Sequence, residues 1–172
     1  SYVGSIIATM VIGASIMVGG KIDNGFIILP LTLAATGILC SIIGTFFVRV
    51  GDGGSPHKAL NTGEFLSAGL MLIASYFIIT NLLPSTWTVG DATYQSVGAF
   101  YATIAGLVAG LLIGKVTEYY TGTGTTPVKS IVDQSETGSA TNIIAGLGVG
   151  MMSTAIPILL ICAAILVAHH LS

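Results

Sequence analysis

The chain has 172 residues, of which 53% are hydrophobic and only 7% are charged, whereas about 25% of the residues in a soluble domain are charged. This composition excludes an ordinary water-soluble fold. The net charge of -2, with five Lys and Arg in all, also excludes a nucleic-acid partner, because binding of the phosphate backbone requires clustered cationic side chains.

Five long stretches without charged residues follow one another along the chain. A helix needs roughly 20 mostly apolar residues to cross the hydrocarbon core of a bilayer. Helices are favoured over barrel strands because the strict alternation of apolar and polar residues is absent. We therefore predict an all-α integral membrane protein, a single membrane-domain segment over residues 1–172, with transmembrane helices at about 1–18, 26–48, 62–83, 95–117 and 141–168. The first is short, as expected for a helix truncated at its start.

Local start signals support two of the helical boundaries. Asn61, followed three residues later by Glu64, has the pattern of a capping box at the start of the third transmembrane helix. Thr126 and Pro127 predict a short helix near 127–136, because proline in the first turn costs no intrahelical hydrogen bond.

The cationic side chains gather in two of the four connections. Residues 49–64 and 115–140 contain four of the five, namely Arg49, Lys58, Lys115 and Lys129. The positive-inside rule assigns such connections to the cytoplasm. We therefore predict cytoplasmic loops at about 49–61 and 118–140, and a cytoplasmic position for the Lys115–Ala140 segment.

Aromatic residues occur near the predicted ends of the helices. Trp87 and Tyr94 flank the connection before the fourth helix, and Tyr119 and Tyr120 follow that helix. Rings at such positions typically lie at the level of the lipid headgroups. We interpret all four as interfacial anchors rather than as ligand-stacking groups.

Small residues recur at helical spacing in the fourth and fifth predicted helices. The fourth contains small residues at every fourth position, which include Gly106 and Gly110, and the fifth contains Gly146 and Gly150. Such a face lets a neighbouring helix approach closely, so we interpret these glycines as packing residues. Pro157 predicts a kink in the fifth helix, because its ring displaces the carbonyl of Ser153.

The predicted helices contain no ionisable Asp, Glu, Lys or Arg at membrane depth, where ion paths usually place them. The glycine-rich stretch from Gly51 to Lys58 does not match the phosphate-binding loop pattern, and the three histidines do not have the spacing of zinc ligands. No nucleophile–base arrangement occurs in the loops. We predict no catalytic, cofactor-binding or metal-binding residue within this segment.

One stretch nevertheless resembles a known family. Gly114-Lys115-Val116-Thr117-Glu118-Tyr119-Tyr120-Thr121, Pro127-Val128 and the run from Thr137 to Leu147 are similar to the membrane-bound, ion-pumping inorganic pyrophosphatases, and Ser1 to Met10 is similar to part of their sixth helix. The resemblance implies a chain of about sixteen helices that hydrolyses cytoplasmic pyrophosphate with Mg²⁺ and moves sodium or protons. This segment would comprise helices six, in part, to ten.

The resemblance also implies where the working groups lie. The acidic pyrophosphate and magnesium motifs of the family lie on other helices, so this segment alone would bind neither Mg²⁺ nor the K⁺ and Na⁺ that the family can require. A pumping carboxylate would directly precede Ser1, which makes Ser1 a neighbour of the ion path. The remaining helices would form an outer ring with a homodimer contact on the tenth, where Gly146 and Gly150 lie.

Two functional hypotheses remain at this stage. The preferred one is a multi-pass segment of a cell-membrane pyrophosphatase that supports the pump without catalytic groups of its own. Such a segment would contact lipid, the other helices of its chain and a second copy of the protein. The alternative is a self-contained five-helix membrane scaffold or assembly subunit with no enzymatic activity.

Overall fold

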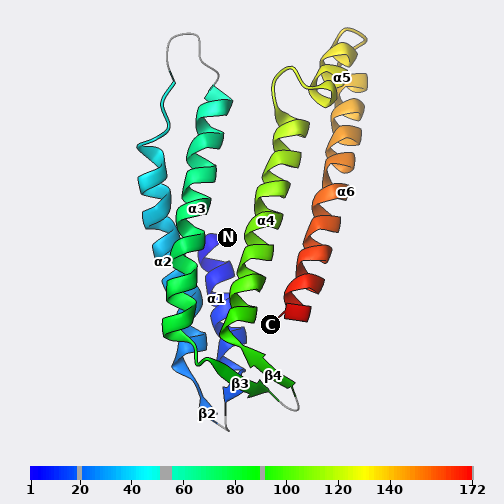
Figure 1. Cartoon of the computed structure of the whole chain (residues 1–172). Helices are drawn as coiled ribbons and strands as arrows, with labels where there is room; N and C mark the ends of the chain where they lie inside the picture. Colours follow the sequence, from blue (N-terminus) through cyan, green and yellow to red (C-terminus); the bar gives the residue numbers. More distant parts are fainter. Residues whose placement is uncertain (19–20, 51–55, 90–91, 172) are drawn as a thin grey trace. The chain divides into compact units, whose positions relative to one another are not determined.

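The computed structural model describes all residues except 19–20, 51–55, 90–91 and 172. The described chain is almost entirely helical, with two short antiparallel hairpins (Figure 1). Its contacts divide it into two units, Ser1–Thr103 and Ile104–Leu171. The boundary falls inside the helix α4 (Ser96–Thr121), so this helix contributes to both units.

The first unit contains three helices before α4. They are α1 (Tyr2–Ala14), α2 (Asn24–Thr45) and α3 (Pro56–Leu82), and α2 packs against both of the others. The carboxylate of Asp23 caps α2 by accepting a 2.7 Å hydrogen bond from the backbone N–H of Gly25. Such a cap satisfies a donor that the first turn leaves without an intrahelical partner.

The helix α3 begins six residues before the start expected at 62. Pro56 is its first residue, a position that proline favours because its fixed φ suits the first turn. Asn61 and Glu64 therefore lie inside the helix, and the predicted capping box is wrong. The predicted loop at 49–61 loses its second half to α3 for the same reason.

Two hairpins occupy the connections that precede α2 and α4. In the first, β1 (Met17–Val18) pairs with β2 (Lys21–Ile22), and in the second, β3 (Thr86–Val89) pairs with β4 (Ala92–Gln95). The register of the second hairpin sets Trp87 opposite Tyr94. The strand β1 also contacts β3, so the two hairpins lie together at one end of the first unit (Figure 1).

A buried cluster joins α2, α3 and the second hairpin. Phe26, Ile79, Leu83 and Trp87 are all buried, with Tyr94 and Phe100 packed around them. The ring of Trp87 meets Phe26 edge-on at 5.0 Å and stacks on Tyr94 at 6.2 Å between centroids. Because only 7% of Trp87 is exposed, it is a core residue of this unit, and its interpretation as a lipid-interface anchor is wrong.

Glycines bring the helices of the first unit into close contact. A Cβ added at Gly13 would overlap the backbone carbonyl of Phe26, and one added at Gly44 would overlap Ser67 and lie 3.0 Å from the carbonyl oxygen of Gly63. The first contact joins α1 to α2 and the second joins α2 to α3. Neither glycine belongs to the periodic small-residue faces identified in the sequence.

The second unit contains the rest of α4, the short helix α5 (Thr126–Ser135) and the long helix α6 (Ser139–Leu171), which packs against α5. Thr125 is the N-cap of α5, so this helix lies within one residue of its predicted limits. None of the residues of α6 is buried, although the helix is strongly apolar. The predicted kink at Pro157, inside α6, stays a prediction.

Four helical stretches of the described chain are long and apolar enough to cross a membrane: Asn24–Thr45, Pro56–Leu82, Ser96–Ser135 and Ser139–Leu171. The helix α1 has only 13 residues, about 20 Å at 1.5 Å per residue, and is too short to cross by itself. The all-α membrane fold is confirmed. The two hairpins are additions that the prediction lacked.

Candidate functional site

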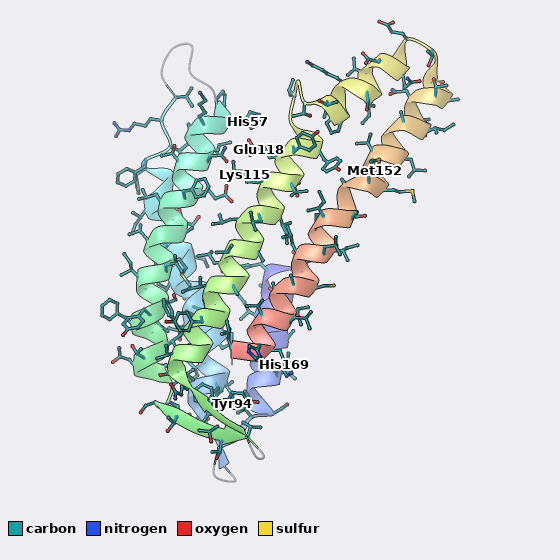
Figure 2. The ribbon with its side chains drawn as sticks, turned by 45° about the vertical axis from the view of Figure 1, so that its right-hand side comes forward. His57, Tyr94, Lys115, Glu118, Met152 and His169 are labelled. Atoms are coloured by element: carbon teal, nitrogen blue, oxygen red, sulfur yellow. The ribbon has the colours of Figure 1, made fainter. Side chains whose placement is uncertain are left out.

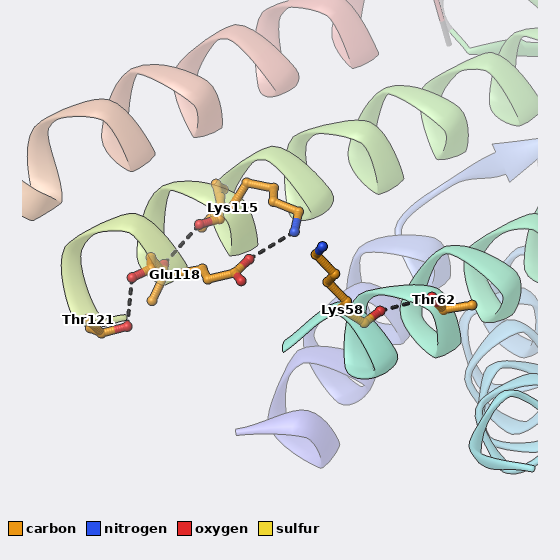
Figure 3. Close-up of polar contacts among 7 residues, drawn as sticks. Lys58, Thr62, Lys115, Glu118 and Thr121 are labelled. Atoms are coloured by element: carbon orange, nitrogen blue, oxygen red, sulfur yellow. Dashed lines mark hydrogen bonds and ion pairs between the residues drawn. The ribbon is translucent and has the colours of Figure 1, made fainter. Parts of the chain in front are cut away.

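The C-terminal end of α4 has an ion pair on its surface (Figure 3). Lys115 Nζ lies 2.8 Å from Glu118 Oε2, one helical turn away, and the two side chains are 41% and 34% exposed. At that exposure an isolated pair of this spacing is worth about 0.3–0.5 kcal/mol. This contact by itself therefore adds little to the stability of the fold.

The turn between α5 and α6 is held by hydroxyl groups. The hydroxyls of Thr137 and Thr141 lie 2.6 Å apart, so one donates to the other. The accepting hydroxyl donates to a backbone carbonyl at 2.8 Å, that of Gln134 for Thr137 or that of Gly138 for Thr141. Gly138 has a φ of +136°, a conformation that side-chain-bearing residues rarely adopt. These polar residues therefore have a structural role in reversing the chain.

The predicted packing glycines are open within this chain. At Gly106, Gly110, Gly146 and Gly150, an added Cβ would find no described atom within 4 Å. Gly146 is half-buried beside the rest of its unit, whereas Gly150 is exposed. Nothing within this unit fills these faces, and the role of the four glycines in packing or in a dimer stays a prediction.

The structure places Ser1 at the exposed N-cap of α1. Its carbonyl accepts a 2.9 Å hydrogen bond from the backbone N–H of Ser5, and its side chain makes no capping bond. Nothing in this geometry relates Ser1 to an ion path. Its assignment as a neighbour of the path stays a prediction.

The described residues do not fit a magnesium site. Mg²⁺ requires clustered oxygen ligands, and no three His, Cys, Asp or Glu side chains come together in the part of the chain that the structure describes. The glycine-rich stretch considered as a phosphate cradle lies at residues 51–58, of which 51–55 are outside the described residues. His57 and Lys58 belong to the first turn of α3.

One polar atom that the sequence analysis did not single out lacks a partner. The side-chain oxygen of Asn142, in the first turn of α6, is buried and has no hydrogen-bond partner among the described residues. Leaving such an atom unsatisfied costs about 1–3 kcal/mol. A donor to the side-chain oxygen of Asn142 would therefore stabilise the first turn of α6.

Comparison with known proteins decides the family. The profile of the family described as inorganic H⁺ pyrophosphatase matches residues 1–172, the full length of the sequence. The chain belongs to this family. The resemblance seen at Gly114–Thr121 and Thr137–Leu147 is thereby confirmed, and the inorganic H⁺ pyrophosphatases are multi-pass membrane proteins, in agreement with the four apolar helices.

Curated relatives of this pyrophosphatase segment are pumps for two different ions. It is 41% identical over 171 residues to a K⁺-insensitive pyrophosphate-energized proton pump of Methanosarcina mazei, which covers 99% of this chain and 23% of the relative. It is also 41% identical to a Clostridium tetani protein provisionally named a K⁺-stimulated pyrophosphate-energized sodium pump. That match extends over 168 residues, which are 98% of this chain and 23% of the relative. The chain thus spans about a quarter of the length of these relatives.

Proposed function

We propose that the full-length protein hydrolyses cytoplasmic pyrophosphate and couples this reaction to the movement of sodium or protons across the membrane. The observation that carries the proposal is the family match over all 172 residues, together with relatives whose names specify pyrophosphate-energized pumps. This match favours the pump over a self-contained five-helix scaffold. Mg²⁺ would be required by the complete protein, and K⁺ and Na⁺ are candidate activators.

We assign residues 1–172 a supporting role in that pump. The helices α2 and α6 contain no Asp, Glu, Lys or Arg, and the described residues offer no cluster of metal ligands. Pumping and metal binding need such groups, so they would come from the rest of the protein. Ser1, at the start of α1, is the one position in the segment that we place next to the ion path.

The test is a pyrophosphatase assay on the full-length protein in membranes, with Mg²⁺ and with K⁺ and Na⁺ added singly and together. Inverted vesicles would report proton uptake by a fluorescent dye and sodium uptake by isotope. We expect magnesium-dependent hydrolysis that drives uptake of one of the two ions. A full-length protein that releases no phosphate from pyrophosphate under any of these conditions would end the proposal and leave the scaffold hypothesis.

We further propose that α6 contributes to a homodimer through Gly146 and Gly150. Support comes from the small, open surface at both positions and from the exposure of the apolar side chains along this helix, which soluble monomers rarely show. Gly146→Leu and Gly150→Leu should weaken association of the full-length protein in native gels. Gly148→Leu is the matched control, because Gly148 is equally open but points to the other side of α6. Equal dimer yields for the three variants would refute this contact.

The proposed orientation has its own test. The segment Lys115–Ala140 would face the cytoplasm, which follows from its cationic residues and the positive-inside rule. In a cysteine-free full-length protein, Ser130→Cys should react with an impermeant maleimide only in inside-out vesicles, because Ser130 is exposed on α5. Thr88→Cys, exposed on β3 before α4, should react only in right-side-out vesicles. The reverse pattern would invert the topology.

A further inference from the structure

One hydrogen bond joins α1 to α2 among the described residues. The hydroxyl of Tyr2 donates to the backbone carbonyl of Ala34 at 3.1 Å, across 32 positions of the sequence. In a bilayer, apolar surface supplies little driving force between helices, so close packing and interhelical hydrogen bonds position them. The Tyr2 hydroxyl is therefore a contact that helps to set where α1 lies on α2.

Tyr2 belongs to the face of α1 that packs on α2. Ile6 and Met10 are half-buried and Gly13 is buried. Tyr2 precedes Ile6 by four positions, so it shares a face with these three residues. Ser1 is about 100° around the helix from Tyr2, because 3.6 residues make one turn. Holding the Tyr2 face on α2 therefore fixes the direction in which the Ser1 side chain leaves the helix.

The two ends of α1 are held to different degrees. Near its C-terminal end Gly13 lies against α2, and Ile16 packs on the buried cluster. The chain then continues into β1, which contacts β3 of the hairpin that carries Tyr94 (Figure 2). Residues 1–5, by contrast, are all exposed. The bond from Tyr2, about 16 Å along the helix from Gly13 at 1.5 Å per residue, is thus the second point that fixes the tilt of α1.

We propose that Tyr2 is a positioning residue of the pump, whose hydroxyl holds the first turn of α1, and with it Ser1, in the geometry that the ion path requires. This role rests on the proposed function, which places Ser1 beside that path. Without the hydrogen bond, the first turn leaves α2 for part of the time, and only molecules in which it is held bind the ion productively. The apparent affinity for the ion then falls in proportion to the fraction that is held.

The test is Tyr2→Phe in the full-length protein in inverted vesicles, which removes the hydroxyl and keeps the ring. Loss of one hydrogen bond shifts the equilibrium between the held and the free first turn by roughly 2- to 12-fold. The Na⁺ concentration for half-maximal uptake should rise by up to this factor. In a proton pump, the pH profile of uptake should instead move to lower pH by up to about one unit. The KM for pyrophosphate should not change, because the substrate would bind in the rest of the protein.

Tyr101→Phe is the matched control. Tyr101 is 51% exposed on α4, and its hydroxyl makes no hydrogen bond among the described residues, so its loss should leave the ion affinity unchanged. Hydrogen–deuterium exchange followed by mass spectrometry gives a readout that does not depend on activity. The amides of residues 1–5 should exchange faster in Tyr2→Phe than in Tyr101→Phe, because the first turn of α1 opens more readily without its bond to α2.

Other results would overturn the proposal in recognisable ways. Faster exchange with an unchanged ion affinity would make the bond a purely structural contact. Unchanged exchange and unchanged affinity would show that the hydroxyl does not hold α1. An equal change in the KM for pyrophosphate would show a disturbance of the whole protein rather than of the ion path. These results refute only the role of Tyr2, whereas an unsubstituted protein that hydrolyses no pyrophosphate refutes the proposed function.

Discussion

Replacing Gly13 with alanine should loosen α1 from α2. A methyl group at this position would overlap the carbonyl oxygen of Phe26 and lie 2.9 Å from its carbonyl carbon and 3.4 Å from the backbone nitrogen of Ile27. All three are backbone atoms inside α2 and cannot rotate away. Pro30 adds to the effect, because it lacks the N–H that would bond the Phe26 carbonyl, and Gly13 is the residue that covers this carbonyl.

The magnitude follows from comparing two positions on the same helix. Overpacking of a close contact costs about 1–3 kcal/mol, while replacing glycine by alanine in a helix gains about 0.8–1.0 kcal/mol. Gly4 lies on α1 with nothing within 4 Å of an added Cβ, so Gly4→Ala has the gain without the overlap. The difference between the two variants is the overlap alone, about 1–3 kcal/mol, or roughly 5–150-fold in an equilibrium constant.

The assay heats the tagged full-length protein in detergent and measures the monodisperse fraction by fluorescence-detected size exclusion, which does not depend on enzymatic activity. Gly13→Ala should lose this fraction at a lower temperature than the unsubstituted protein, and Gly4→Ala should not. If Gly13→Ala withstands heat as well as Gly4→Ala, then α1 does not lie against the Phe26 carbonyl, and the packing of α1 on α2 is wrong.

Three further substitutions test other parts of the fold by the same heating assay. Asp23→Ala removes the cap of α2 and should lower the free energy of unfolding by about 0.5–2 kcal/mol. Asp23→Asn keeps an acceptor at this position and should lower it less. Trp87→Ala should lower the free energy of unfolding by about 3–5 kcal/mol, far more than Phe47→Ala, because Phe47 is 58% exposed. Equal losses of stability for the two variants would show that Trp87 is not a core residue. Gly138→Ala should lower the free energy of unfolding by about 1–3 kcal/mol, because the φ of Gly138 is +136°. Gly148→Ala should leave the stability unchanged or raise it, because Gly148 lies inside a helix with open space around it.

The helices were predictable because membrane insertion depends on quantities that a sequence contains directly. The length of an apolar run and the absence of charge decide whether it can span, and the four long helices follow the predicted runs. Their ends were less predictable, because competing local signals exist. Pro56 and Asn61 both favour a helix start, and only the structure shows that the proline prevails.

The hairpin at Thr86–Gln95 was missed although its sequence has a recognisable signal. Thr, Trp, Val and Tyr favour strands, and Gly90-Asp91 is a dipeptide typical of a two-residue turn. Trp87 near a predicted helix end was instead interpreted by the membrane-interface rule. That rule considers depth alone, whereas the burial of Trp87 depends on Phe26, which is 61 residues away in sequence.

Glycine packing was the least predictable feature of the candidate site. Periodic glycines in α4 and α6 indicate a face that can accept a neighbour, but a pattern within one helix does not identify that neighbour. Gly13 and Gly44 lie outside the glycine series of α4 and α6, yet they make close contacts between helices of the first unit. The approach of two backbones is a property of a pair of helices, so it cannot be inferred from one of them.

The two units therefore depend on their surroundings to different degrees. Residues 1–103 contain the buried cluster around Ile79 and Trp87, and so provide part of their own stability. The 33 residues of α6 include none that is buried, and the side-chain oxygen of Asn142 has no hydrogen-bond partner among the described residues. Because a bilayer supplies little driving force between apolar helices, such a helix is positioned by close packing and polar contacts. Residues 104–171 therefore depend on contacts from outside this unit, which is consistent with the dimer surface that we propose on α6.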